Sequence, residues 1–105
     1  MEERKREIFV GYRRVIGITD IQGIVDYIKE GEAFKKVYLV ATHPLAGPVA
    51  EYLEKNLKPL VAVEFLLTDN FDRTIDEIKE HHKDEEVWVT SLNDFGDRAL
   101  SFDPD

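Results

Sequence analysis

The side chain in this sequence best suited to proton transfer near neutral pH is His43. It follows the apolar run VYLVA, and Pro44 and Pro48 stiffen the loop around it. An imidazole changes its charge close to physiological pH, so His43 could act as a general base or donate a hydrogen bond to a phosphate. A helix that starts directly after it would favour an anion at the same place. The alternative role is local, in which the ring bonds only to the backbone of its own loop.

Polar side chains also follow each of the other apolar runs. In open parallel sheets, ligands bind beyond the carboxyl ends of the strands, which is where these segments would meet. Hydroxyl, amide and carboxylate groups also cap the helices that follow, so each residue has a structural alternative. The candidate ligand-binding residues are Thr19, Asp20, Thr42, His43, Thr68, Asp69, Ser91 and Asn93.

Motifs for metals and cofactors are missing from the sequence. His81 and His82 lie at the end of a helical pattern, where they are predicted to interact favourably with the helix dipole. No spacing of His, Asp and Glu matches a set of metal ligands such as H-x-x-x-H, so no dedicated metal site is expected. The glycines form neither G-x-G-x-x-G nor a Walker A motif, and no G-x-S-x-G elbow is present. The sequence therefore predicts no cofactor.

Four apolar runs are predicted to form the strands that position these residues, with three helical patterns between them. The runs span residues 8–18, 37–41, 60–67 and 87–89. The first run is either one long strand or two short strands broken at Arg13 and Arg14. The second is apolar throughout, as in a central strand covered by helices on both faces.

Capping residues and prolines predict where the three helices begin and end. The first helix is expected to have Thr19 or Asp20 as its N-cap and to end at Gly31. The second is expected to begin near Pro48 or to be kinked there, because proline fits the first turn of a helix and disrupts later turns. The residues predicted to face the core are Val49, Leu53 and Leu57 in the second helix and Phe71, Ile75 and Ile78 in the third.

The resulting order is β-α-β-α-β-α-β. Helices between successive strands act as crossovers, which join parallel strands with a right-handed connection. The sequence therefore predicts the α/β class, as a three-layer α/β/α Rossmann-like sandwich around a mostly parallel sheet of about four strands.

Length and composition predict a single soluble domain. The chain has 105 residues, of which 43% are hydrophobic, and residues 1–105 are expected to form one domain with flexible ends at about 1–6 and 99–105. No apolar segment is long enough for a membrane helix, and no signal peptide or cysteine is present, so a cytoplasmic location is expected. Charged residues make up 34% of the chain, as in thermophile proteins.

The net charge of −8 argues against binding to duplex nucleic acid, which requires many Lys and Arg contacts to phosphate. Basic residues gather in the first 14 positions, and acidic residues gather at the end of the chain. This asymmetry is typical of solvated termini. It is also compatible with an anion-binding edge, or with a contact between the subunits of a homodimer.

Three segments carry a resemblance to a known family. They read KKVYLVATHPLAGPVAEYL, VAVEFLLTDNFDRTIDEIKEHH and EEVWVTSLNDFGDRAL. Together they resemble a CARF domain, the ligand-sensing Rossmann-like module of CRISPR-associated proteins. In that family a strand ending in Thr is followed by a helix, then by a strand with an acidic loop and a helix, and then by a strand that runs into a polar turn with glycine. The resemblance implies a homodimer that binds a cyclic oligoadenylate across its two-fold axis. The residues it implies for the binding site are Thr42, His43, Ser91, Asn93 and Arg98.

The last turn departs from the family pattern. The family usually has two adjacent glycines followed by a small or basic residue, whereas this chain reads NDFGDR at positions 93–98. The acidic side chains would repel a phosphate unless Arg98 or main-chain amides dominate.

The sequence is compatible with three functions. The leading one is a small ligand-binding or regulatory module, dimeric, that takes an anionic or nucleotide-like ligand at the carboxyl ends of the strands. The second is a small phosphodiester-cleaving enzyme that uses His43 for catalysis. The third is a structural or adaptor protein with no ligand, for which an exposed apolar patch would be needed.

Overall fold

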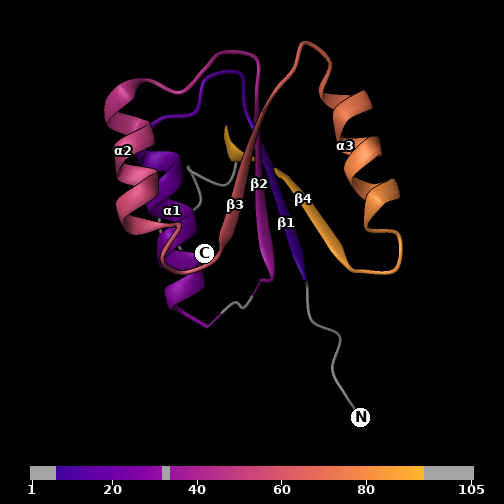
Figure 1. Cartoon of the computed structure of the whole chain (residues 1–105), viewed down its shortest axis with the longest axis horizontal. Helices are drawn as coiled ribbons and strands as arrows, with labels where there is room; N and C mark the ends of the chain where they lie inside the picture. The colour runs from indigo at the N-terminus through magenta and orange to yellow at the C-terminus, as the bar shows by residue number, and fades with distance from the viewer. Residues whose placement is uncertain (1–6, 32–33, 94–105) are drawn as a thin grey trace, which may run out of the picture.

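A computed structural model describes residues 7–31 and 34–93 of the chain (Figure 1). The elements follow one another in the predicted β-α-β-α-β-α-β order. The flexible ends predicted at 1–6 and 99–105 lie outside the described residues. The elements are β1 (Ile8–Tyr12), α1 (Ile18–Lys29), β2 (Lys36–Ala41), α2 (Gly47–Asn56), β3 (Ala62–Leu67), α3 (Phe71–His81) and β4 (Val87–Ser91).

The four strands form one sheet in the order β3-β2-β1-β4, and every neighbouring pair is parallel. Helices α1 and α2 cover one face of the sheet, and α3 covers the other (Figure 1). The crossover from β3 to β4 passes over β2 and β1, which is why α3 lies on the opposite face from the other two helices. The predicted three-layer α/β/α sandwich is confirmed. None of the helices in the described part is long and apolar enough to span a membrane.

The first apolar run contains one short strand, in place of the long strand or the two strands predicted for residues 8–18. β1 stops at Tyr12, and the chain then turns away from the sheet. The turn is held by the Arg14 carbonyl oxygen, which accepts hydrogen bonds from the amides of Thr42 (3.1 Å) and His43 (3.2 Å). The loop after β1 is thereby joined to the loop after β2.

Helix α1 begins one residue after Gly17, so the predicted N-cap at Thr19 or Asp20 is wrong. Asp20 is the third residue of the helix, and its carboxylate accepts a hydrogen bond of 2.8 Å from the Gly17 amide. A negative charge in the first turn also interacts favourably with the helix dipole. The predicted end is confirmed, since the helix stops at Lys29 and Gly31 follows with a φ of 121°.

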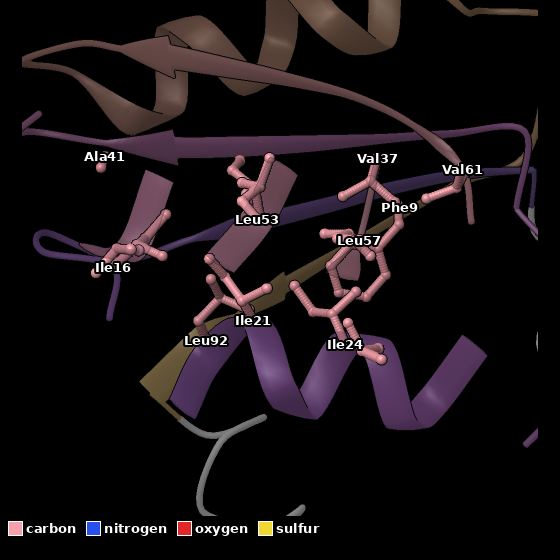
Figure 2. Close-up of a cluster of buried hydrophobic side chains, with 13 residues drawn as sticks. Phe9, Ile16, Ile21, Ile24, Val37, Ala41, Leu53, Leu57, Val61 and Leu92 are labelled. Carbon is pink, nitrogen blue, oxygen red and sulfur yellow. The ribbon is translucent and has the colours of Figure 1, made fainter. Parts of the chain in front are cut away.

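Both faces of the sheet are buried by apolar side chains. On the α1 and α2 face, Ile21 and Ile24 from α1 converge with Leu53 and Leu57 from α2 around Phe9 of β1 (Figure 2). On the other face, Ile75 and Ile78 of α3 pack against the sheet as predicted. The residues that these two side chains meet there are Ile8, Val10, Tyr38 and Val40.

Candidate functional site

The carboxyl ends of all four strands lie along one edge of the sheet, at the top of Figure 1. The loop after β2 therefore lies between the loops that follow β3 and β1, and β4 ends on the far side of β1. This arrangement is the premise from which the candidate residues were predicted. The side chains that reach this edge differ greatly in whether they are open to a ligand.

Thr42 and His43 lie at the end of β2 and contact each other. The Thr42 hydroxyl donates to the Arg14 carbonyl oxygen at 3.2 Å and lies 2.9 Å from His43 Nδ1. Because the hydroxyl has a single proton, which goes to Arg14, it accepts the proton on Nδ1. The other ring nitrogen, Nε2, is then the acceptor of the neutral ring, and His43 is exposed to solvent. The ring is therefore oriented by its neighbour and open on its reactive side.

Arg14 is the residue of this site that sequence reasoning missed. Its carbonyl oxygen holds Thr42 and His43, and its own side chain is exposed. In the sequence, Arg13 and Arg14 were interpreted as a possible break in a strand and as part of a basic N-terminal segment, not as residues of this site. The feature that could have identified Arg14 is the position of a basic pair directly after a buried strand, at the edge of the sheet where ligands bind.

The beginning of α2 lies just beyond His43. Its N-cap, Ala46, has no side chain that could accept from the first amides, and the first turn contains no acidic residue. Pro48 occupies the second helical position, so the helix begins where it was predicted to begin. The first turn of α2 therefore keeps its positive dipole end without an internal counter-charge.

Asp20 and Thr19 do not join this group. Asp20 is 1% exposed, and both of its carboxylate oxygens accept hydrogen bonds from Arg13 Nη1, at 2.9 and 3.0 Å. With the Gly17 amide as a further donor, the Asp20 carboxylate is fully occupied inside the protein. Thr19 is exposed in the first turn of α1.

The residues after β3 serve the following helix. The Thr68 hydroxyl accepts from the Asn70 amide at 3.0 Å and from the Thr74 hydroxyl at 2.8 Å. Asn70 is the N-cap of α3, and its side chain accepts from the Arg73 amide. Asp69 stays exposed between them. Thr68 therefore fixes the start of α3, and Asp69 is the residue of this loop that a ligand could reach.

The end of β4 contributes Ser91 and Asn93. Ser91 lies opposite Tyr12 in the register and is half-buried, whereas Asn93 is exposed. Leu92, between them, is fully buried. Arg98, which the resemblance implied for the binding site, lies outside the described residues. Within 7–31 and 34–93, no three His, Asp or Glu side chains lie close enough together to hold a metal ion.

His82, at the C-cap of α3, takes part in a polar network rather than acting only on the helix dipole. Its Nδ1 bonds to Glu85, and its Nε2 lies 2.8 Å from the Tyr38 hydroxyl. Glu85 also pairs with Lys35. The carboxylate can only accept, so Nδ1 carries a proton and donates to Glu85, while Nε2 and the Tyr38 hydroxyl share the second hydrogen bond. This network joins the loop before β4 to β2, at the opposite end of the sheet from His43.

The Glu85 network predicts a pH dependence of stability. Hydrogen bonds from Lys35 and His82 hold the pKa of Glu85 below its ordinary value of 4.5, and the bond to Glu85 raises the pKa of Lys35 above 10.5. A lowered carboxylate pKa stabilises the fold above the unfolded pKa and loses this effect as the pH falls through the folded value. The raised lysine pKa stabilises below 10.5 and loses its effect as the pH rises.

We therefore expect Glu85→Gln to lower the melting temperature at neutral pH and to have progressively less effect below the ordinary carboxylate pKa of 4.5. Melting curves of the variant and the wild type across the acid range measure this difference. Glu80→Gln, an exposed acid on α3, is the control and should change stability little at any pH. If the difference in melting temperature between Glu85→Gln and the wild type stays constant into strong acid, the charge of Glu85 does not stabilise the fold.

The comparisons with known proteins add no relative to this picture. Neither the protein-family models, nor the curated proteins, nor the solved structures contain a significant match to the chain.

Proposed function

We propose that this chain is a small binding module that takes an anionic, nucleotide-like ligand at the carboxyl edge of its sheet, between the loops after β1 and β2. The observation that supports the proposal best is the junction at Arg14. Its carbonyl oxygen holds the amides of Thr42 and His43, so the exposed Arg14 and His43 are neighbours although 29 positions apart in the sequence. Arg13 cannot substitute for Arg14, because its guanidinium is paired with Asp20.

The groups at this junction suit a phosphate. A guanidinium presents several N–H donors in a fixed plane and binds phosphate oxygens in pairs. A protonated His43 adds an N–H donor at Nε2, and the uncapped first turn of α2 adds a positive dipole end. In a chain with a net charge of −8, such a group of donors is a local exception to the overall charge.

The phosphodiester-cleaving alternative lacks a comparable argument. A histidine acting as general base is usually oriented by a third group, often a carboxylate. In the part of the chain that the structure describes, the His43 ring bonds to Thr42, and no carboxylate bonds to the ring. We therefore propose binding rather than catalysis for this edge.

Ligand binding can be tested by thermal stability and calorimetry with inorganic phosphate, a mononucleotide, a dinucleotide and a cyclic oligoadenylate. The last probe examines the CARF-like resemblance directly. A ligand present at about 100 times its dissociation constant should add about 2.7 kcal/mol to the free energy of unfolding. We expect Arg14→Gln to weaken binding by about 10-fold or more, because hydrogen bonds to charged groups contribute about 1.5–3 kcal/mol.

Lys29→Gln is the matched control. It removes one exposed positive charge at the last residue of α1, at the opposite end of the sheet, and should leave the affinity within about two-fold at moderate salt. His43→Ala should weaken binding without lowering the free energy of unfolding of the free protein by more than about 0.5 kcal/mol. No stabilisation by any phosphate compound, or equal losses with Arg14→Gln and Lys29→Gln, would overturn the proposed function.

A further inference from the structure

In the part of the chain that the structure describes, the outer edge of β3 is open to pairing with another strand. β3 is the terminal strand of the sheet, with β2 on one side and no further strand of the described residues on the other. Five of its six residues, AVEFLL, are apolar. It contains no proline or lysine, the residues that commonly prevent edge strands from pairing. Leu67, at its end, is 57% exposed.

The hydrogen bonds to β2 determine which backbone groups of β3 point outward. The amide of Thr68 donates to the Ala41 carbonyl oxygen at 2.8 Å, so residue 68 faces β2. Backbone groups alternate between the two sides of a strand, so residues 62, 64 and 66 also face β2. Val63, Phe65 and Leu67 therefore turn their N–H and C=O groups toward the open edge.

The side chains of the same residues lie on the face that carries α2. Val63 and Phe65 line a hollow of about 160 Å³ between β3 and α2, with Leu53 among the helix residues opposite. Side chains alternate along a strand, so Leu67 points to this face as well. The open backbone groups and the apolar side chains of this edge thus belong to the same three residues.

From this edge we infer that β3 pairs antiparallel with β3 of a second copy of the chain. The strand complements itself when the two-fold axis passes through Phe65, so that Phe65 lies opposite Phe65 of the second copy and Val63 lies opposite its Leu67. These opposed residues form three pairs, because the pair of Val63 with Leu67 occurs twice. Their backbone groups all point outward, and each pair forms two hydrogen bonds, about six in total. Leu67 of each copy then lies beside the apolar hollow of the other.

The two neighbouring registers that keep the same faces together have their axis at Glu64 or at Leu66, and each forms about four of these hydrogen bonds within the strand. The axis at Glu64 also places this carboxylate directly opposite its own copy, at the closer, non-hydrogen-bonded spacing. In the favoured register Glu64 lies opposite Leu66 of the second copy, and its ion pair with Lys36 (2.9 Å) is kept. Hydrogen bonding therefore favours the axis at Phe65, and charge disfavours the axis at Glu64.

The assembly is independent of the proposed function. It joins two four-stranded sheets into one continuous sheet, and antiparallel pairing places the two carboxyl edges at opposite ends. Each subunit would then bind ligand at its own edge, and no ligand would span the two. Loss of the dimer and loss of ligand binding are thus separate results in the two sets of experiments.

The dimer is tested by analytical ultracentrifugation over a range of protein concentrations. We expect a reversible monomer–dimer equilibrium in the wild type. Leu67→Lys should raise the dimer dissociation constant about 100-fold, because it brings an ammonium group into each apolar contact. Leu60→Lys is the matched control, since Leu60 is 42% exposed but precedes the paired segment, and it should leave the equilibrium unchanged.

The register is tested by disulfide formation, for which the absence of native cysteine is an advantage. Phe65→Cys should form a disulfide dimer on mild oxidation, since opposed residues of this kind have Cα atoms about 5.5 Å apart. Glu64→Cys should not, and circular dichroism of both variants checks that they are folded. A wild type that is monomeric at every concentration, or a dimer that survives Leu67→Lys, overturns the inference and leaves this edge to a strand from another protein.

Discussion

Replacing Phe9 with alanine is expected to lower the free energy of unfolding by about 3–5 kcal/mol, the usual range for a buried aromatic residue. Phe9 is fully buried as the second residue of β1, a central strand of the sheet. Its ring meets Trp88 of β4 edge-to-face at 5.2 Å and Phe34 at 5.3 Å. The substitution therefore removes these two aromatic contacts on the α1 and α2 face as well as buried apolar area.

The result can be measured by urea unfolding, monitored through the fluorescence of Trp88, the one tryptophan of the chain. Phe71→Ala is the comparison, because Phe71 is half-buried against Tyr12 at the start of α3, and it should cost about 1 kcal/mol. Phe9→Leu, with an expected cost below about 2 kcal/mol, keeps the measurement possible if the alanine variant does not fold. Equal losses for Phe9→Ala and Phe71→Ala would contradict this view of the core.

The strands and helices could be predicted because their signals are local. The run at 37–41 is apolar at every position, and it forms a strand with α1 and α2 on one face and α3 on the other. The stripe Val49, Leu53 and Leu57 follows the helical period, and all three side chains are buried. Parallel pairing followed from the helices between successive strands.

The strand order and the details of β1 depend on contacts between distant residues. The β3-β2-β1-β4 order requires α3 to lie on the other face of the sheet. The sequence of α3 does not indicate which face it covers. Gly11 is an example at the level of one residue. A β-carbon there would approach the side chains of Leu92 to 2.8 Å and Phe9 to 2.9 Å, so a larger residue would force these buried side chains to move. The sequence does not show that Leu92 and Phe9 lie beside this glycine.

The candidate site was predicted in part for the same reason. Thr42 and His43 were identified because they follow a strand whose end could be read from its apolar run. Arg14 was missed because its role depends on a backbone contact with residues far along the chain. Asp20 was expected to be available to a ligand, and its pairing with Arg13, seven positions earlier in a turn that the sequence did not predict, takes it out of the site.

The pairing of Asp20 gives the second large prediction, a loss of about 2–3 kcal/mol of stability in Asp20→Asn. The variant keeps the size of the side chain but removes its charge. Arg13 Nη1, which donates to both carboxylate oxygens, would then face an amide that can accept at only one atom. The Gly17 amide, now 2.8 Å from the carboxylate, would compete for the same acceptor, and the first turn of α1 would lose its negative charge.

Chemical denaturation of Asp20→Asn measures the loss, and Asp26→Asn on the same helix is the matched control. Asp26 is exposed, so the same chemical change there should alter stability by no more than about 0.5 kcal/mol. A double-mutant cycle with Arg13→Gln separates the ion pair from the Gly17 bond. If Arg13→Gln alone lowers the free energy of unfolding by nearly as much as Asp20→Asn, the ion pair accounts for most of the loss. If Asp20→Asn and Asp26→Asn prove equally stable, the buried carboxylate does not stabilise the turn after β1, and the hydrogen bonds of the Arg14 carbonyl oxygen hold this turn without it.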